Sequence, residues 1–167
     1  MPATPEQLYD RFRALDITAI VHTHANVFTV EEAQAHTAHL DGGHCKNLFL
    51  RDKKERMWLV TVEDERRVDL KALQQRLGAQ KLSFGSAERL MTYLGVAPGS
   101  VTPLAVINDP DQRVEVVLSA SLLRHALINV HPLRNDATVQ IGNTDLVRFI
   151  EACGHTPSVI DFDSELD

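Results

Sequence analysis

Lys46 and Asn47 stand directly before the apolar run Leu48–Leu50, within the stretch GGHCKNLFLRDKK. A lysine at the start of a buried strand either extends its ammonium group to water or points it into a cleft, where it stabilises negative charge. The neighbouring asparagine can orient a bound group through hydrogen bonds. From these residues alone, a solvated lysine at a strand end remains a full alternative to a binding site.

Two further segments carry residues suited to acyl chemistry. Gly99 begins a Gly-x-x-x-Pro loop that ends at Pro103, and a glycine permits a positive φ and close approach of a ligand. Backbone N–H groups near Gly99 and Ser100 could therefore bind a carbonyl oxygen or an oxyanion. His131 precedes a proline, which favours an extended backbone at a strand end. Taken singly, the loop and the histidine are more typical of purely structural roles.

Cys45 and a pair of histidines allow two other chemistries. Beside Lys46, the Cys45 thiol could have a lowered pKa and act as a nucleophile. His22 and His24 share one face of a predicted strand, and together with His44 and Cys45 they could bind zinc. Because the chain has 8 histidines in 167 residues, pairs at this spacing also arise by accident.

The elements that position these residues are predicted from helix caps, glycine stops and hydrophobic periodicity. Thr4 with Pro5 begins one helix, and Asp69 and Gly78 bound another. The predicted helices span 5–15, 29–38, 69–78, 86–95, 119–125 and 144–155, and the predicted strands span 18–24, 46–52, 57–63, 104–109, 113–119, 126–133, 137–142 and 158–162.

The strand that begins at Lys46 is expected in the middle of a sheet. Side chains alternate along a strand, so residues 46, 48 and 50 share one face and 47, 49 and 51 the other, and both faces are apolar in the middle. Many consecutive strands with short turns predict an α/β fold of the α+β type. We expect a single domain over residues 1–167, with a central mixed, largely antiparallel sheet packed by helices.

Composition excludes several classes of protein. The formal net charge of −6 argues against a protein that coats DNA or other nucleic acid non-specifically. No apolar run approaches the ~20 residues of a membrane span. The N-terminal stretch MPATPEQLYDRF lacks the pattern of a secretory signal, and the 2 cysteines form no CxxC motif. A cytoplasmic location is therefore expected.

Taken together, three segments resemble a known family: KNLFLRDKK, LSFGSAERLMTYLGVAPGSVTPLAVIND and HPLRNDATVQIGNTDLVRFIEACGHTP. The family is that of the YbaK-like, free-standing relatives of the editing domain of bacterial prolyl-tRNA synthetase. The resemblance extends from about Thr18 to Pro157 in the family's order. The KNLFLRDKK form points to the subgroup that removes alanine mischarged onto proline tRNA.

The resemblance implies a trans-editing deacylase that hydrolyses the ester between a wrong amino acid and the 3′-terminal ribose of tRNA(Pro). The family's lysine matches Lys46, its next residue Asn47, its glycine loop Gly99–Pro103 and its histidine His131. Lys46, Gly99 and His131 are then the expected catalytic residues, and Asn47, Ser100 and Pro103 bind the substrate. The family needs no metal or organic cofactor. The expected partner is the acceptor end of tRNA(Pro), with docking on prolyl-tRNA synthetase left open.

An editing pocket must accept a small amino acid and exclude the correct one by size. Ile20 and Phe28 are candidates for its wall, although Ile20 also fits a core position and Phe28 a hydrophobic staple before a helix. A basic hairpin tip is expected near Lys46 and could contact the tRNA, or be only a solvated turn; it consists of Arg51, Lys53, Lys54 and Arg56. A cysteinyl-tRNA(Pro) deacylase and a non-catalytic module that binds amino acids or tRNA ends remain the alternative functions.

Overall fold

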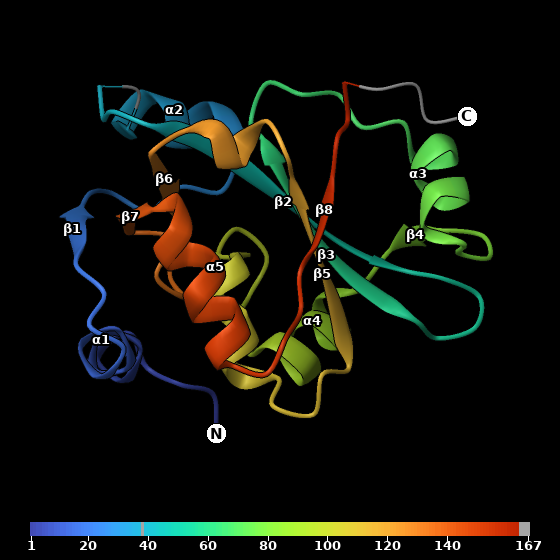
Figure 1. Cartoon of the computed structure of the whole chain (residues 1–167), viewed down its shortest axis with the longest axis horizontal. Coiled ribbons are helices and arrows are strands. Elements are labelled where there is room, and N and C mark those ends of the chain that lie inside the picture. Colours follow the sequence, from blue (N-terminus) through green and yellow to red (C-terminus); the bar gives the residue numbers. More distant parts are fainter. Residues whose placement is uncertain (38, 164–167) are drawn as a thin grey trace.

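One mixed sheet organises the computed structural model, which describes residues 1–37 and 39–163. Its strands are β1 (Ala19–Thr23), β2 (Gly43–Arg51), β3 (Met57–Glu63), β4 (Ser83–Phe84), β5 (Val114–Ser119), β6 (Leu127–Val130), β7 (Ala137–Gly142) and β8 (Ser158–Ile160). They lie in the order β1-β7-β6-β2-β3-β5-β8, with β4 also paired to β2 (Figure 1). β2 therefore lies inside the sheet, and the predicted α+β class with a mixed sheet is confirmed.

The helices begin and end largely where the sequence predicts. They are α1 (Pro5–Ala14), α2 (Val30–Thr37), α3 (Leu70–Leu77), α4 (Ala87–Leu94) and α5 (Asn143–Ala152), with the 3₁₀ helices η1 (Pro103–Asn108) and η2 (Leu122–Arg124). Thr4 caps α1 in a capping box, and Gly78 ends α3 at a φ of +65°. The predicted end of the second helix, Ala38, lies outside the described residues. Among the described residues, none of the helices has the length and apolar character that a bilayer crossing needs.

The prediction of a strand at residues 104–109 is wrong, because this segment forms most of the 3₁₀ helix η1. The hydroxyl of Thr102 accepts a hydrogen bond of 3.2 Å from the amide of Leu104, and Pro103 occupies the first helical position. Both features start helices. A short apolar run is equally consistent with a buried strand and a buried helical turn, and here the cap decides.

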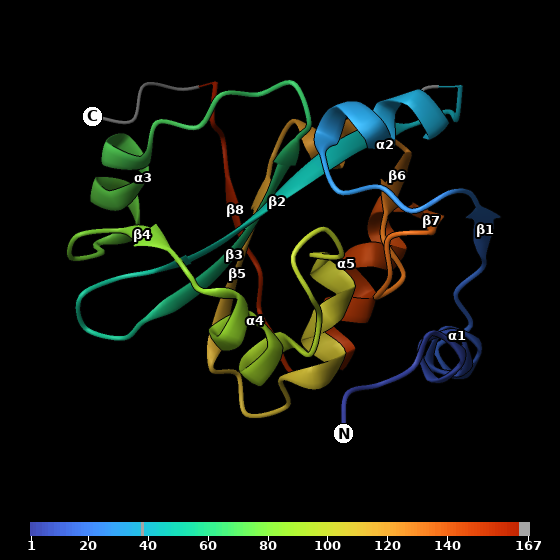
Figure 2. The ribbon, with the colours of Figure 1, turned by 180° about the vertical axis from the view of Figure 1, so that it is seen from behind.

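Two apolar cores lie on opposite faces of β2, β3 and β5. The larger core joins Phe49 of β2 to α1, α4, α5 and η1, whereas the smaller core joins Leu50 to α3 and β8. Adjacent residues of a strand point to opposite faces, so β2 has apolar contacts on both sides. Figure 2 shows the face of the molecule that carries α2, α4 and the loop before η1. This double burial fixes the register of β2 and therefore the places of Lys46 and Asn47.

β2 and β6 pair over a short distance and then separate. Their parallel register contains Gly43 opposite Ile128 and His44 opposite Asn129, whereas β2 continues to pair with β3 as far as Arg51. The next residues of β2 therefore have no partner strand on the β6 side. This separation opens the space in which the candidate site forms.

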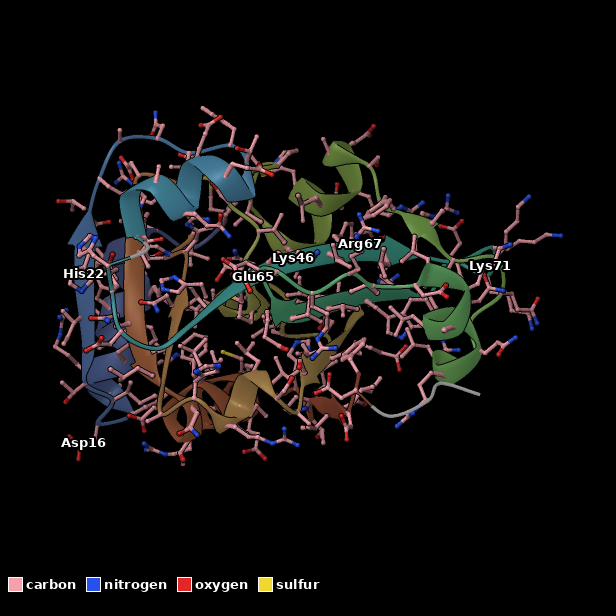
Figure 3. The ribbon with its side chains drawn as sticks, turned by 90° about the horizontal axis from the view of Figure 1, so that it is seen from above. Asp16, His22, Lys46, Glu65, Arg67 and Lys71 are labelled. Carbon is pink, nitrogen blue, oxygen red and sulfur yellow. The ribbon has the colours of Figure 1, made fainter. Side chains whose placement is uncertain are left out.

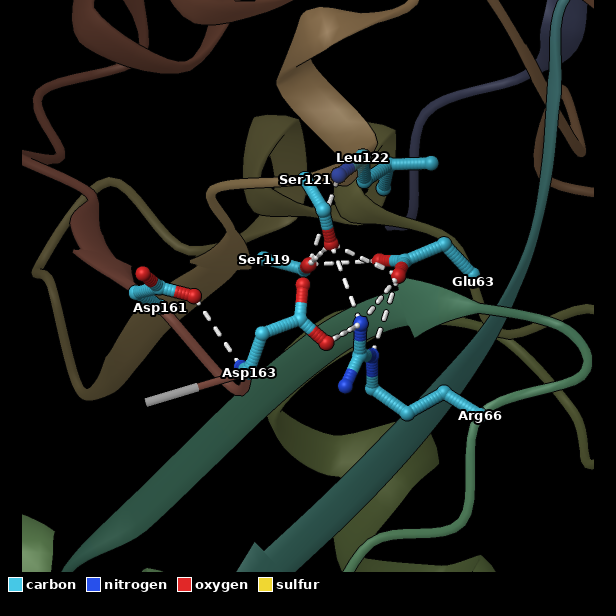
Figure 4. Close-up of polar contacts among 7 residues, drawn as sticks. All are labelled: Glu63, Arg66, Ser119, Ser121, Leu122, Asp161 and Asp163. Atoms are coloured by element: carbon cyan, nitrogen blue, oxygen red, sulfur yellow. Dashed lines mark hydrogen bonds and ion pairs between the residues drawn. The ribbon is translucent and has the colours of Figure 1, made fainter. Parts of the chain in front are cut away.

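A polar cluster anchors the C-terminal segment to the end of β3 (Figure 4). Arg66 binds Glu63 and Asp163, each at 2.8 Å, and Glu63 accepts hydrogen bonds from Ser119 at 2.5 Å and Ser121 at 2.7 Å. Burial raises the pKa of Glu63, but these hydroxyls and Arg66 outweigh it and hold the pKa at about 2. The carboxylate is therefore charged at neutral pH and keeps the end of β3 in place.

Candidate active site

A cavity of about 200 Å³ lies where β2 and β6 separate. This is smaller than the ~300–1,000 Å³ of pockets for drug-sized ligands, so it suits a small chemical group. The lining includes Cys45, Lys46 and Asn47 from β2, Asn129 and His131 from the end of β6, Val27 and Phe28 from the segment before α2, and Gly99 and Val101 from the loop before η1. Three residues predicted to act together, Lys46, Gly99 and His131, thus border one cavity.

Lys46 brings a positive charge to this cavity. Its side chain is half-buried, and no carboxylate of the described residues forms a salt bridge with it. Seen from above, Lys46 lies over the middle of the molecule, between His22 at one end and Lys71 at the other (Figure 3). An ammonium group that forms no salt bridge within this part of the chain can bind an anionic ligand or support developing negative charge.

The Asn47 side chain is held between two protein groups. Its Nδ2 donates to the carbonyl oxygen of Val101 at 3.0 Å, and its Oδ1 accepts from the hydroxyl of Thr61 at 2.7 Å. Thr61 is fully buried on β3, directly opposite Asn47. Asn47 therefore connects β2 and β3 to the glycine loop, a contact that depends on strand register and that the sequence did not reveal.

Gly99 adopts a conformation that an L-residue rarely accepts. Its φ is +91°, and a Cβ atom there would lie 3.3 Å from Cδ1 of Phe28. Among the described residues, the N–H groups of Gly99 and Val101 have no hydrogen-bond acceptor. Because both residues line the cavity, their amides could bind a substrate oxygen.

Ser100 and Pro103 do not line the cavity. The amide of Ser100, expected to help hold a carbonyl oxygen, donates instead to the carbonyl of Ala97 at 3.0 Å and closes a turn. Ser100 is buried, with 8% of its surface exposed, and Pro103 is buried at the start of η1. These two residues shape the loop, and a direct contact with substrate is not supported for either.

His131 presents one basic nitrogen. Its Nδ1 lies 3.3 Å from the carbonyl oxygen of Ala137, which can only accept, so Nδ1 carries the proton and Nε2 the lone pair. Burial lowers the pKa of His131; the Ala137 carbonyl opposes this effect, and nearby His24 adds to it. The imidazole is therefore neutral near pH 7 and acts as a hydrogen-bond acceptor at Nε2.

The family model described as the aminoacyl-tRNA editing domain matches residues 24–149. The chain belongs to the aminoacyl-tRNA editing domain family. Members of this family are hydrolases of the aminoacyl-tRNA ester. Membership of this family therefore identifies the bond that the editing domain breaks as the ester bond of an aminoacyl-tRNA.

Similar proteins match almost the whole length of this chain. It is 41% identical over 160 residues to prolyl-tRNA synthetase associated domain-containing protein 1 of Danio rerio, a match that spans 95% of this chain and 87% of the relative. It is 38% identical over 148 residues to the prolyl-tRNA editing protein ProX of Acetoanaerobium sticklandii, spanning 88% and 90%. The solved structure of hypothetical protein APE2540 shares the fold, with a TM-score of 0.75, 18% identity, and coverage of 92% and 97%.

Of the two residues predicted for the wall of the pocket, the editing domain places one at the cavity. Phe28 lines it and packs on Gly99, with 67% of its surface exposed. Ile20 lies on the edge strand β1, is 54% exposed and does not line the cavity. The expectation for Ile20 is therefore wrong, both as a wall and as a core residue, because an apolar run does not distinguish an edge strand from a buried one.

The basic hairpin tip lies at the far end of β2 from Lys46 (Figures 1 and 2). With a strand rise of ~3.3 Å per residue, Arg51 is about 16 Å along the strand from Lys46, so the expected proximity is wrong. Arg51 pairs with Glu55 at 2.7 Å, and Arg56 pairs with Glu115 at 3.1 Å. Lys53 and Lys54 are exposed, and no carboxylate of the described residues forms a salt bridge with either.

Neither alternative chemistry fits the editing domain. Burial raises the pKa of the Cys45 thiol to about 12, and Sγ donates to the carbonyl of Asn129 at 3.2 Å, so the thiol is not an activated nucleophile. His22 contacts Oε1 of Gln140 at 2.7 Å, and His24 contacts the hydroxyl of Thr138 at 2.9 Å. Within residues 1–37 and 39–163, no three metal-ligating side chains gather into a metal site.

The sequence did not predict the roles of two asparagines: Asn129, which lines the cavity, and Asn135, which holds the lining residue Val27. Asn135 accepts from the amide of Val27 at 3.1 Å through its carbonyl and donates to the carbonyl of Val27 at 2.7 Å, which fixes the segment before α2. Asn129 donates to the carbonyls of Asp41 and Gly43, which holds the start of β2. Asn135 falls within the HPLRN segment, so its closeness in sequence to His131 was the feature that could have predicted its role.

Proposed function

We propose that this editing domain hydrolyses the ester of mischarged tRNA(Pro), with Ala-tRNA(Pro) as its main substrate. The observation that carries the proposal is the meeting of Lys46, Gly99 and His131 at one small cavity. The prolyl-tRNA names of the similar proteins support the choice of tRNA. Docking on prolyl-tRNA synthetase is a separate proposal, which co-sedimentation of the two purified proteins tests.

The site can catalyse hydrolysis mainly by positioning and electrostatic stabilisation. Water adds to the ester carbonyl carbon, the carbon–oxygen bond to the ribose breaks, and the ribose oxygen leaves with a proton. The N–H groups of Gly99 and Val101 can hold the developing oxyanion, and Lys46 can bind the terminal phosphate or support that charge. Nε2 of His131 can accept a hydrogen bond from the attacking water or from the vicinal ribose hydroxyl.

Size exclusion accounts for the choice of amino acid. A proline-binding synthetase site cannot firmly reject a smaller residue, because one methylene group is worth only ~1–3 kcal/mol. We propose that the cavity reverses this selection, with the contact between Phe28 and the glycine loop as the part of its wall that limits size. This wall would then admit a methyl side chain and exclude a pyrrolidine ring.

The decisive experiment incubates the protein with tRNA(Pro) charged with alanine, cysteine or proline and follows release of the amino acid. We expect release of alanine above the other two, and loss of this activity in Lys46→Ala without a change in thermal stability. Lys71→Ala, which changes an exposed lysine that does not line the cavity, serves as the control. Release chiefly of cysteine would reassign the substrate, and no release of any amino acid would favour a binding module.

A further inference from the structure

Thr61 lies one strand away from the cavity and reaches it through Asn47. Its hydroxyl donates to Oδ1 of Asn47 at 2.7 Å, and Nδ2 of Asn47 donates to the carbonyl of Val101 at 3.0 Å. We propose that Thr61 is a positioning residue, which holds the Gly99–Val101 loop at the cavity through Asn47. The catalytic part of this inference rests on the proposed function.

Thr61 determines which way the Asn47 amide points. The carbonyl oxygen of Val101 can only accept, so the hydrogen bond to it requires the NH₂ group of Asn47. The remaining Oδ1 then faces β3 and needs a donor. Because Thr61 is directly opposite Asn47 in the register and is fully buried, its hydroxyl is the donor at that position. Without this hydroxyl, the two orientations of the Asn47 amide become closer in energy. In the flipped orientation, Oδ1 of Asn47 faces the carbonyl oxygen of Val101, and the hydrogen bond to the loop is lost.

The loop held by this connection has a demanding conformation. Gly99 has a φ of +91°, and the N–H groups of Gly99 and Val101 have no acceptor among the described residues. The turn from Ala97 to Ser100 and the Thr102 cap define the loop locally, but they do not connect it to β2. The hydrogen bond from Asn47 makes that connection, and it therefore sets where the loop amides lie relative to Lys46.

The effect of such a positioning residue is on the chemical step. Displacing a reacting group by about 1 Å can cost roughly 100-fold in rate, whereas contacts made by the rest of a tRNA are unaffected. For Thr61→Val we expect kcat for alanine release to fall about 10- to 100-fold, with KM changed less than about twofold. Thr61→Ser keeps the hydroxyl donor and should restore kcat to within about threefold of the wild type.

Two comparisons separate positioning from general destabilisation. If Thr61 acts through Asn47, Thr61→Val should have no further effect on kcat in an Asn47→Ala background, because the two changes break one connection. Ser119→Ala is the matched control: Ser119 is fully buried and bonded to Glu63, and neither residue lines the cavity. An equal loss of kcat in Ser119→Ala, or an undiminished effect of Thr61→Val in the Asn47→Ala background, would overturn the proposal.

A measurement independent of catalysis tests the connection itself. Amide hydrogen exchange of Ser100 and Leu104, whose N–H groups are hydrogen-bonded within the loop and its cap, should become faster in Thr61→Val and in Asn47→Ala, and should remain as in the wild type in Ser119→Ala and Thr61→Ser. Exchange that Thr61→Val leaves unchanged would refute the connection, even if the protein proves to be an active deacylase. Conversely, failure of the wild type to release any amino acid would refute the proposed function, and the exchange data would still decide the connection.

Discussion

Nδ1 of His131 and the carbonyl oxygen of Ala137 lie 3.3 Å apart, and this contact determines which ring nitrogen carries the proton. Nε2 is left with its lone pair at a cavity that Lys46 and Gly99 also line. The editing domain thus combines a charged amine with a neutral imidazole. One site therefore contains a hydrogen-bond acceptor, His131, for a hydroxyl group or a water molecule. It also contains a cation, Lys46, for an anionic group.

The pH dependence of stability should show the titration of His131. Burial lowers its pKa in the folded protein, so the unfolded chain, with a histidine pKa of ~6.5, takes up the proton first as the pH falls. The free energy of unfolding that His131 contributes is therefore complete above about pH 6.5 and decreases as the pH falls toward the lowered value. His131→Asn keeps a donor for Ala137 but does not titrate, and denaturant unfolding between pH 5 and 7.5 should show a flatter curve for it. Parallel curves for the two proteins would contradict the assignment.

Gly99→Ala should reduce both stability and activity. A left-handed backbone costs an L-residue about 1–2 kcal/mol, and the new methyl group would press on Phe28 at 3.3 Å. Gly78→Ala is a matched control, because Gly78 also has a positive φ, +65°, but a Cβ atom there would have no atoms within 4 Å. Urea unfolding should show a loss of stability in both variants, while the deacylation rate falls in Gly99→Ala only. Equal rates in the two variants would remove Gly99 from the site.

Phe28→Ala should relax the selection by size. Phe28 is 67% exposed, so removing its ring costs little buried area, and the free energy of unfolding should change by less than about 1 kcal/mol. The ratio of kcat/KM for Ala-tRNA(Pro) to that for Pro-tRNA(Pro) should fall about 10-fold or more, because the wall that excludes the larger ring is lost. Phe84→Ala, at a residue that is 60% exposed and does not line the cavity, should leave the ratio unchanged. If both variants behave alike, Phe28 is not part of the wall.

Lys53→Ala/Lys54→Ala should weaken tRNA binding without slowing the chemical step. These exposed lysines are available to phosphates, whereas Arg51 and Arg56 are engaged by Glu55 and Glu115. Each lost phosphate contact should reduce the slope of log Kd against log salt concentration by about 1. Kinetics at several salt concentrations should show a raised KM and an unchanged kcat. An unchanged KM and slope would identify the hairpin tip as a solvated turn.

Local signals predicted the helices well and the sheet partly. Thr4, Asp69 and Gly78 act within one turn of the chain, so their effects can be read from neighbouring residues. The sequence also identified the central strand, because residues 46–51 have apolar side chains on both faces. It failed at residues 104–109, where a Thr-Pro start outweighs an apolar run, and at Ile20, where exposure depends on the place of β1 in the sheet.

The candidate site was predictable only as far as family resemblance reaches. Periodicity alone could not bring Lys46, Gly99 and His131 together, since they lie on separate elements. The contact of Thr61 with Asn47 depends on antiparallel register, and the use of the Ser100 amide depends on a turn with Ala97. The hairpin tip was misplaced for a related reason: residues that are close in sequence to Lys46 are carried away from it by an extended strand.

β2 and β6 pair only briefly before they diverge, and the cavity lies at the point of divergence. Backbone hydrogen bonds define where β2 and β6 diverge. The base of the cavity can therefore shift only if hydrogen bonds between the strands are broken and re-formed. The rim consists of a loop and the approach to one helix, which can be rebuilt without unzipping any strand. A new amino-acid preference can therefore arise from changes at the rim while the arrangement of β2 and β6 stays the same.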